Sequence, residues 1–291
     1  MSFFNLLEKG NLKKYTKTIV QKYAITPSKS SGQNFVIEKA VIDALLSVVD
    51  TSQEDIIVEV GTGIGTLTYF LLQKCQKVFS FEIDPILSSI VKKEFINYGE
   101  KLKIISGDFL NLEIPPHQKL ISNLPFNISS PFIKKITTIE NRPEIMALTL
   151  QREFANHLCA KPGDSSYSRI SVFSSYSYKF ELIQTFPPHY FTPRPKVQSA
   201  LVRGTKLKSP EIIKDKNFFE FLTRLFCRKH KKVRNNLQIY AKQYSRDQRK
   251  LFMNELDRLE YHSRKPISLS PSEILDLFNV FNEILITFLS K

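Results

Sequence analysis

The stretch "DIIVEVGTGIGTLTYFLLQK" (residues 55–74) decides the fold. An apolar run of strand character leads directly into Gly61, Gly63 and Gly65, and a helical apolar pattern follows these glycines. Glycines at such a junction allow a tight turn and a close approach of a ligand to the backbone. The N-terminus of the next helix favours negative or polar groups. The stretch therefore predicts a nucleotide-type site, and a plain strand-to-helix turn is the alternative.

Helical and strand patterns alternate on both sides of this stretch, from residue 38 to about 152. The predicted strands cover residues 55–60, 77–84, 102–106, 119–123 and 144–151, and helical patterns lie between all of them except the third and fourth. This alternation predicts a parallel sheet with helices on both faces. Two further apolar stretches, 178–186 and 196–204, have no helix between them and predict an antiparallel pair at the edge of the sheet.

The pattern becomes wholly helical after about Leu207. Four helical stretches follow, and Ser270-Pro271 has the character of a helix start. We therefore predict a Rossmann-like α/β domain over residues 1–207, with a basic extension at 1–28, and a small all-helical domain over residues 208–291.

The positive charge of the chain is concentrated in two blocks. The formal net charge is +14, and residues 1–35 hold six lysines against one glutamate. Residues 206–250 hold fourteen Lys or Arg against four acids. Two basic blocks around a nearly neutral body favour a polyanionic partner, most simply nucleic acid. A solvated basic surface that aids solubility is the alternative.

Other features limit the class of protein. No run of about 18 apolar residues predicts a transmembrane helix, and the N-terminus lacks the apolar region of a signal peptide. The three cysteines, Cys75, Cys159 and Cys227, are far apart and form no metal or disulfide pattern. We therefore expect a cytoplasmic protein without a metal site.

The glycine pattern indicates which nucleotide-type ligand binds. Glu82 ends the next predicted strand, 21 residues after Gly61, where an acidic side chain can accept hydrogen bonds from ribose hydroxyls. A dinucleotide fingerprint would need glycine at position 66, which is Thr66. The G-x-G-x-G spacing, preceded by Glu59, is similar to the S-adenosylmethionine site of class I methyltransferases.

Asp108 lies at the end of the third predicted strand, within "GDF" (107–109). Ligands of such sheets bind beyond the carboxyl ends of the strands, so Asp108 could accept a hydrogen bond from an adenine amino group, with Phe109 beside the ring. The alternative is a turn aspartate that caps the next segment.

The stretch "SNLPFNISSPF" (122–132) follows the fourth predicted strand and predicts the reaction site. An aromatic amine is a poor nucleophile because its lone pair is delocalised into the ring. If Asn123 and the Leu124 carbonyl each accept one of its N–H groups, they aim this lone pair and stabilise the charge that develops on nitrogen. Pro125 stiffens the turn, and Phe126 would stack on an extruded base. Alternatively, Phe126 is a core residue and Asn123 caps a helix.

A set of motifs along the chain carries a family resemblance: "GQNFV" (32–36), "EVGTGIGTLT" (59–68), "FEID" (81–84), "GDF" (107–109), "NLPFNISSP" (123–131), "LQREFANHLCAKPGDSSYSRISV" (150–172), "FTPRPKVQSALVR" (191–203) and "RKHKKVRNNL" (228–237). Together they resemble the KsgA-type ribosomal RNA adenine dimethyltransferases. The resemblance implies dimethylation by S-adenosylmethionine of N6 of two adjacent adenines in the 3′-terminal hairpin of small-subunit (16S) rRNA. It also implies a late, partly assembled small ribosomal subunit as the substrate.

The resemblance further implies roles for individual residues. The cofactor contacts would be Asn34, Val36, Gly61, Glu82, Asp108 and Asn123. Phe191 would pack on the other side of the target adenine, although its segment also has the character of a rigid surface linker. A basic cluster in the helical domain would grip rRNA phosphates: Arg228, Lys229, Lys231, Lys232 and Arg234. The chain departs from the family at Phe126, where tyrosine is common.

Two other functions stay open at this point. Related enzymes methylate an adenine of large-subunit rRNA and confer antibiotic resistance, and they share the Asn-Pro-aromatic motif. A non-catalytic assembly factor could also retain the fold, although it would have no need of the cofactor. The segments 191–203 and 228–237 favour the small-subunit enzyme, which we expect to be a monomer.

Overall fold

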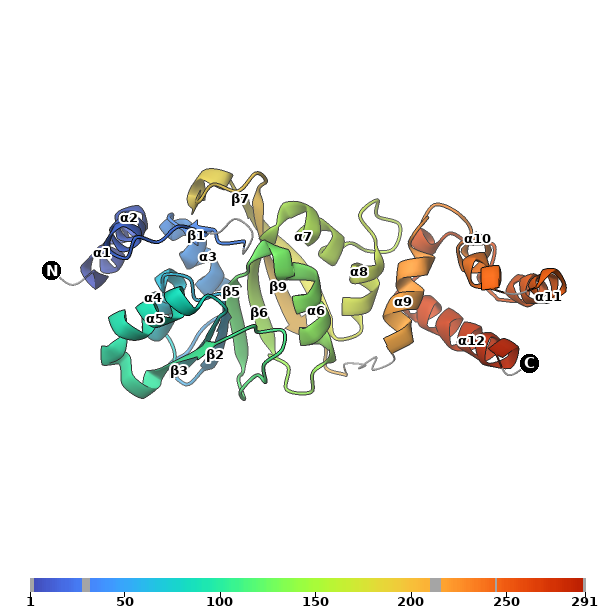
Figure 1. The fold of residues 1–291 in the computed structure, drawn as a ribbon, viewed down its shortest axis with the longest axis horizontal. Helices are drawn as coiled ribbons and strands as arrows, with labels where there is room; N and C mark the ends of the chain where they lie inside the picture. The colour runs from blue at the N-terminus through green and yellow to red at the C-terminus, as the bar shows by residue number, and fades with distance from the viewer. Residues whose placement is uncertain (1–2, 28–31, 210–215, 244, 290–291) are drawn as a thin grey trace. The chain divides into compact units, whose positions relative to one another are not determined.

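The computed structural model describes residues 3–27, 32–209, 216–243 and 245–289 (Figure 1). They divide into two compact units, one within residues 1–155 and 178–208 and one within 156–177 and 209–291. The boundary predicted near residue 207 differs from this division in one respect. The segment 156–177 belongs to the unit of the C-terminal helices, because its apolar side chains lie in the same core as theirs.

The first unit is built on a seven-stranded sheet with the order β4-β3-β2-β5-β6-β9-β7. Its strands are β2 (Ile56–Val60), β3 (Lys77–Glu82), β4 (Leu102–Ser106), β5 (Lys119–Asn123), β6 (Ile145–Gln151), β7 (Tyr178–Phe186) and β9 (Ser199–Lys206). The first five pair in parallel, which confirms the predicted parallel sheet. The antiparallel β7–β9 pair is also confirmed, but β9 lies between β6 and β7, so of this pair only β7 lies at an edge of the sheet.

Helices cover both faces of this Rossmann-like sheet: α3 (Lys39–Val48), α4 (Thr66–Leu72), α5 (Pro85–Glu94) and α6 (Ser129–Thr138). The connections β2–α4–β3 and β5–α6–β6 run in opposite directions along the sheet. Right-handed crossovers therefore place α4 and α6 on opposite faces. Short 3₁₀ turns complete the unit: η1 (Ile96–Lys101), η2 (Phe126–Ile128) and η3 (Pro188–Tyr190).

Two helices that we did not predict, α1 (Phe4–Glu8) and α2 (Leu12–Lys22), precede the sheet. Leu12, Tyr15 and Ile19 are fully buried and belong to the same core as α3, α4 and α5. A two-residue strand, β1 (Phe35–Val36), packs against α2 and pairs antiparallel with β8 (Phe191–Thr192). The N-terminal extension is therefore an integral part of this unit.

The second unit is helical, with its own aromatic core. It contains α8 (Arg169–Ser175), α9 (Lys216–Leu225), α10 (Val233–Leu237), η4 (Gln238–Gln243), α11 (Arg246–Asp257), η5 (Pro266–Ser268) and α12 (Pro271–Leu289), and α7 (Arg152–Cys159) precedes it along the chain. The core side chains come from α8, α9, α11 and α12, among others, and include Phe218, Phe221 and Phe281. Helices α7 and α8 were not predicted.

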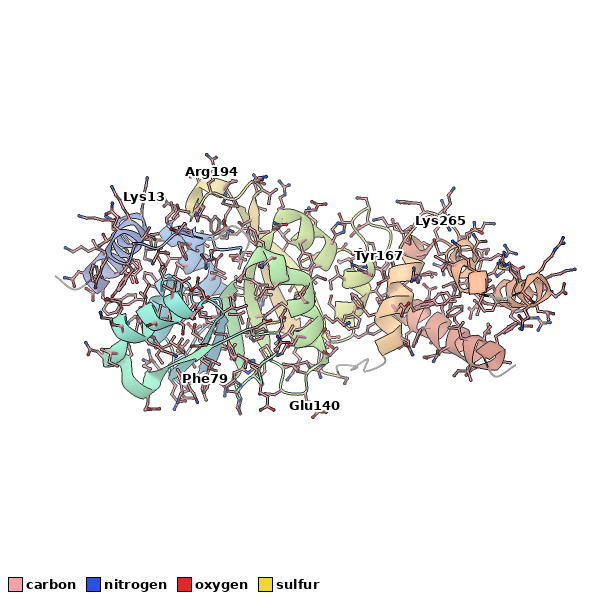
Figure 2. All side chains as sticks on the ribbon, in the orientation of Figure 1. Lys13, Phe79, Glu140, Tyr167, Arg194 and Lys265 are labelled. Atoms are coloured by element: carbon pink, nitrogen blue, oxygen red, sulfur yellow. The ribbon has the colours of Figure 1, made fainter. Side chains whose placement is uncertain are left out.

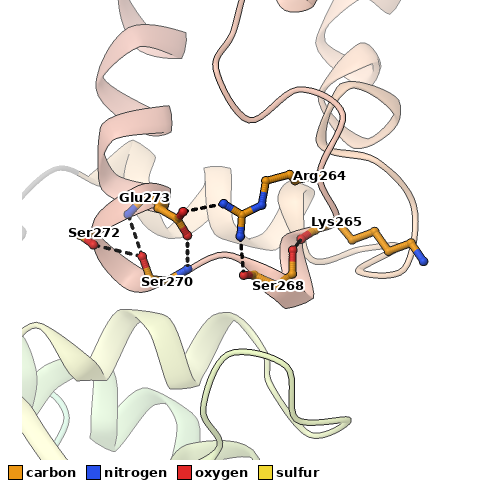
Figure 3. A network of polar contacts seen from close by, with 6 residues as sticks. All are labelled: Arg264, Lys265, Ser268, Ser270, Ser272 and Glu273. Carbon is orange, nitrogen blue, oxygen red and sulfur yellow. Dashed lines mark hydrogen bonds and ion pairs between the residues drawn. The ribbon is translucent and has the colours of Figure 1, made fainter.

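The start of α12 shows why the sequence signal at residue 270 was reliable (Figure 3). Ser270 Oγ accepts a hydrogen bond from the Glu273 N–H at 3.2 Å, and Glu273 Oε2 accepts one from the Ser270 N–H at 2.7 Å. This reciprocal pair is a capping box, which satisfies two backbone donors that a helix leaves free. Arg264 pairs with the other Glu273 oxygen at 2.5 Å. The predicted helix start is confirmed.

The described ranges contain no helix that combines the length and the apolar character needed to cross a membrane. Within the same ranges, no group of three His, Cys, Asp or Glu side chains is arranged to hold a metal ion. The three cysteines are free thiols.

The glycine loop generates a prediction for stability. Gly65 has φ +83°, and a β-carbon on it would lie 2.6 Å from the Phe95 ring. We expect Gly65→Ala to lower the free energy of unfolding by about 2–4 kcal/mol, because left-handed backbone strain adds to overpacking. Urea unfolding measures the change. Gly163→Ala is the control, because Gly163 also has positive φ but open space around it. Equal losses in both variants would show that Phe95 does not restrict the loop.

Candidate active site

A cavity of about 220 Å³ lies at the carboxyl ends of the parallel strands β2 to β5. Its walls come from residues 32–35, the glycine loop 60–63, and the segments 81–83, 107–109 and 123–128. Five segments that are distant in sequence meet there because the parallel strands all end at one edge of the sheet. The cavity therefore unites most of the residues that the motifs predicted.

Gly61 shapes the wall between the loops after β2 and β5. Its φ is +83°, and a β-carbon there would lie 3.1 Å from Cδ of Pro125. The Gly61 N–H donates to the Phe81 carbonyl at 2.8 Å, which fixes the loop against β3. A side chain at this position would fill the space between the two loops, so the glycine keeps the cavity open.

Glu82 provides a fixed carboxylate at the end of β3. Its Oε2 accepts from the Gly63 N–H at 2.7 Å and its Oε1 from the Asp84 N–H at 2.9 Å. The side chain is buried, and this burial raises the pKa of Glu82 while the two N–H groups act in the opposite direction. Each oxygen has a second lone pair, which leaves the carboxylate able to accept a bond from a ligand hydroxyl.

Asp108 lines the cavity and also caps its own turn. Its Oδ1 accepts from the Leu110 N–H at 2.9 Å, and its Oδ2 from the Asn111 amide at 3.0 Å. The capping role that the sequence left open is therefore present. Both oxygens keep a second lone pair, so capping does not exclude a ligand amino group as a further donor.

Lys135 supports the loop that follows Asp108, a role that no motif indicated. Its ammonium group donates to the carbonyls of Phe109 at 2.7 Å, Leu110 at 3.1 Å and Leu112 at 2.5 Å. Burial lowers the pKa of Lys135, and the nearby Asp108 carboxylate opposes that shift. All three donors of the ammonium are used, so this lysine holds the loop in place.

The amide of Asn123 has a fixed orientation at the end of β5. Its Nδ2 donates to the Asn34 carbonyl at 2.8 Å, and its Oδ1 accepts from the Thr149 hydroxyl. A carbonyl oxygen only accepts, so the NH₂ group must face Asn34 and the oxygen must face Thr149. Oδ1 keeps one free lone pair. The sequence could not indicate Thr149, which is its neighbour only through the pairing of β5 with β6.

The three residues after Asn123 differ in how they lie relative to the cavity. The Leu124 side chain is buried, and its carbonyl accepts no hydrogen bond from the described residues. Pro125 lines the cavity. Phe126 is half-buried and does not line it, although Pro125 and Asn127 on either side of it do. Its predicted stacking role stays a prediction.

Two predicted contacts differ from what the structure shows. The Val36 side chain is buried in β1 and does not line the cavity, whereas the Phe35 ring does. Phe191 is 2% exposed and lies in the core, so its ring is not presented for stacking on a base in this conformation. The physical reason is the β1–β8 pairing, in which Phe191 faces Val36. The segment around Phe191 thus holds the 32–36 segment in place.

Other cavity residues escaped the sequence analysis, among them Phe35, Gly63 as a donor to Glu82, and Ile83. Ile83 is 59% exposed although it is apolar. Its place directly after Glu82, at the carboxyl end of a predicted strand, could have indicated that Ile83 lines the cavity. Phe109, expected beside a ring, lines the cavity and packs edge-on against Phe81 with ring centres 5.1 Å apart.

The predicted basic cluster lies in the second unit, between α9 and the end of α10. Lys229 Nζ donates to the carbonyls of Ser165 at 2.5 Å and Tyr167 at 3.2 Å. Arg234 forms a two-point ion pair with Asp257. These two side chains are thus engaged within the protein.

The other members of the cluster face solvent. Arg228 is exposed and uses one of its nitrogens to bond the Asn235 carbonyl at 2.9 Å. Lys231 and Lys232 are exposed, and their ammonium groups contact no described acid. Of the five predicted phosphate ligands, these three have charge available for a partner.

Glu59 lies directly behind the glycine loop and has no solvent exposure. Its Oε2 accepts from the hydroxyls of Thr68 and Ser80, each at 2.7 Å, and its Oε1 has no partner among the described residues. Burial raises the pKa of Glu59 to about 8. A protonated Glu59 carries no charge into the core.

Comparison with known proteins identifies relatives of the chain. Residues 26–280 match the family described as ribosomal RNA adenine dimethylase. A probable ribosomal RNA small subunit methyltransferase A from Methanococcoides burtonii is 34% identical over 90% of this chain and 96% of its own. The crystal structure of a dimethyladenosine transferase from Plasmodium falciparum is 26% identical, with a TM-score of 0.73, over 86% of this chain and 98% of its own. The 23S rRNA methyltransferase ErmE shares the fold at 21% identity, with a TM-score of 0.60, over 86% of this chain and all of its own.

Glu59 generates a prediction for the pH dependence of stability. An unfolded glutamate titrates near pH 4.3, whereas the pKa of Glu59 in the folded protein is about 8. Between these values the folded state holds a proton that the unfolded state has lost, so stability falls as pH rises from about 5 to about 8. We expect Glu59→Gln to remove about 2–5 kcal/mol of this decline, measured by urea unfolding across that range. Exposed Glu54→Gln is the control. An unchanged pH dependence in Glu59→Gln would show that Glu59 ionises normally.

Proposed function

Because the chain belongs to the ribosomal RNA adenine dimethylase family, we propose that it dimethylates N6 of two adjacent adenines in the 3′-terminal hairpin of small-subunit rRNA. The family uses S-adenosylmethionine as its methyl donor. The observation that carries the proposal is the Asn123 amide, held in one orientation beside the cavity with a free lone pair on its oxygen.

The cavity fits S-adenosylmethionine. The Gly61 position leaves room that a β-carbon would fill, and Glu82 and Asp108 offer acceptors for ribose hydroxyls and an adenine amino group. Phe35 and Phe109 supply apolar walls. When bound, the cofactor supplies an electrophilic methyl group on a positively charged sulfur. We propose that Asn34, Gly61, Glu82, Asp108 and Asn123 hold it.

The protein's part in the transfer is to position the adenine amine. Asn123 Oδ1 accepts one N–H of the amine and the Leu124 carbonyl accepts the other, which rehybridises the nitrogen and directs its lone pair out of the ring plane. The same two oxygens stabilise the positive charge that grows on nitrogen. That charge makes the remaining N–H acidic only after transfer, so no general base is required beforehand.

Phe126 would provide one stacking face for the extruded base. A phenylalanine has no hydroxyl group, so this face can hold the ring but cannot hydrogen-bond it. Phe191 can supply a second face only if β8 moves, because its ring is buried in this conformation. The amine must also rebind after the first methyl group is added for dimethylation to occur.

The small subunit is favoured over the large subunit as the substrate. The relative that is 34% identical is named for the small subunit. The large-subunit enzyme shares the fold alone. A non-catalytic assembly role is disfavoured because the acceptors of the site are all present and oriented.

We propose that the enzyme acts as a monomer on the assembling small subunit, in the cytoplasm. Arg228, Lys231 and Lys232 would grip rRNA phosphates with charge that no described acid neutralises. Lys229 and Arg234, predicted for the same role, would first have to leave their internal partners.

Methyl transfer to purified ribosomal subunits tests the proposal. The wild-type protein and labelled S-adenosylmethionine are incubated with undermethylated small and large subunits separately, and the nucleosides are analysed. We expect dimethyladenosine from the small subunit alone. Asn123→Ala should lower the rate at least about 100-fold through lost charge stabilisation. Exposed Asn97→Ala is the matched control and should keep the wild-type rate.

Label in the large subunit would assign the enzyme to the other class. An Asn123→Ala variant with the full rate would end the proposed mechanism. Absence of label in both subunits, with cofactor still bound, would favour an assembly factor.

Thr149 should act as a positioning residue through Asn123. Thr149→Val keeps the shape of this fully buried side chain but removes the hydroxyl that orients Oδ1. We expect kcat to fall about 10-fold while KM for the cofactor stays within about twofold, because the misaligned amide affects the reacting amine more than cofactor binding. Thr149→Ser restores the donor and should recover most of the rate. Failure of serine to recover it would indicate a packing effect.

A further inference from the structure

The exposed side of α2 carries a compact positive surface that the functions above do not use. We define the lysine face as three exposed residues of this helix: Lys13, Lys14 and Lys17. At 100° per residue these positions lie within one third of the helix circumference. The surface there is slightly hollowed, with Asn11, Thr18 and Gln21 around the lysines. Figure 2 shows Lys13 at the outer boundary of the molecule.

No described carboxylate neutralises the charge of the lysine face. Two neighbouring lysines have ion-pair partners, Lys22 with Glu94 at 2.7 Å and Lys39 with Asp43 at 2.5 Å. None of the ammonium groups of the lysine face has a carboxylate within ion-pair distance among the described residues. This surface is therefore available to an external anion.

The opposite side of α2 is sealed into the core. Leu12, Tyr15 and Ile19 are each at most 1% exposed. The Tyr15 hydroxyl donates to the carbonyl of Ile64, in the glycine loop, at 2.7 Å. Since the apolar side is occupied, α2 cannot bury it in a lipid bilayer, and the helix presents a rigid, polar and positive surface.

The position of the lysine face relates it to the cavity. Helix α2 packs against β1, which directly follows the cavity residues 32–34, and β1 pairs with β8. Arg194 and Lys196, both exposed, follow β8. Arg194 and Lys13 both lie at the upper edge of this unit in Figure 2. Positive side chains therefore lie on α2 and directly after β8, two elements that contact β1.

We propose that the lysine face of α2 binds phosphates of the rRNA substrate outside the target adenines. The proposal rests on the proposed function, because it assigns this surface to the substrate of the same site. Phosphate contacts fix the register of a nucleic acid without reading its sequence. Helices α1 and α2 precede residue 26, where the family match begins, so this surface is an addition to the matched region.

Charge reversal of two lysines tests the proposal. The Lys13→Glu/Lys17→Glu variant of the full chain is compared with Lys74→Glu/Lys103→Glu, which changes the net charge equally. Lys74 and Lys103 are exposed and lie towards the amino ends of β3 and β4, away from the cavity. The affinity for an unmodified small-subunit rRNA transcript is measured by filter binding at several salt concentrations. Cofactor affinity is measured in parallel as a check on folding.

We expect the Lys13/Lys17 variant to bind about 10-fold more weakly, with the slope of log K against log salt reduced by about 2, and the control to stay within about twofold of wild type. Equal weakening in both variants, or none in either, overturns the proposal. Binding of anionic vesicles that depends on these lysines, with rRNA binding unchanged, also overturns it. If the wild type binds rRNA through these lysines but transfers no methyl group, the proposed function fails and the RNA surface stands.

Discussion

The active site depends on the register between β5 and β6, which places Asn123 beside Thr149. In this register the amide oxygen faces a hydroxyl donor and the amide nitrogen reaches the Asn34 carbonyl. Side chains alternate between the two faces of a sheet, so a slip of one residue would turn Asn123 to the opposite face. The apolar residues of β5 and β6 are buried on both faces, and the sheet therefore fixes the register through its core.

The sequence could predict those site residues that lie in a recognisable motif at the end of a parallel strand. Glycines after β2, an acid at the end of β3 and Asp108 after β4 must converge, because parallel strands end at one edge. It could not predict Thr149 or Lys135, whose roles depend on which strands pair and which helix covers the loop. The Asn34–Asn123 bond joins residues 89 positions apart. Phe191 was expected to stack on the base but is buried, because β8 pairs with β1. Each of these strands has two residues, which is too short to predict from the sequence.

The charge pattern of the sequence favours a polyanionic partner, but it does not indicate which lysines and arginines are available to bind it. A lysine whose ammonium group donates to backbone carbonyls, as Lys229 does, must give up those bonds before it contacts a phosphate. An arginine in a two-point pair with a carboxylate, as Arg234 is, has the same requirement. The net charge of the sequence does not distinguish Lys229 and Arg234 from residues such as Lys231, whose ammonium group makes no such bond to a described residue. Only the folded structure separates structural cations from available ones.

Helix α2 of the N-terminal extension has one side that packs in the core and one side that carries available positive charge. Its buried residues 12, 15, 16 and 19 have helical spacing and pack α2 into the core of the sheet unit, while the lysines on its other side form no ion pair with a described residue. Tyr15 then links the helix to the glycine loop through the Ile64 carbonyl. A polyanion held on the lysine face would thus be anchored to the same compact unit that shapes the cavity. Such an arrangement limits how far a bound RNA can shift relative to the reacting groups, which is the geometric condition that Asn123 needs to orient an amine.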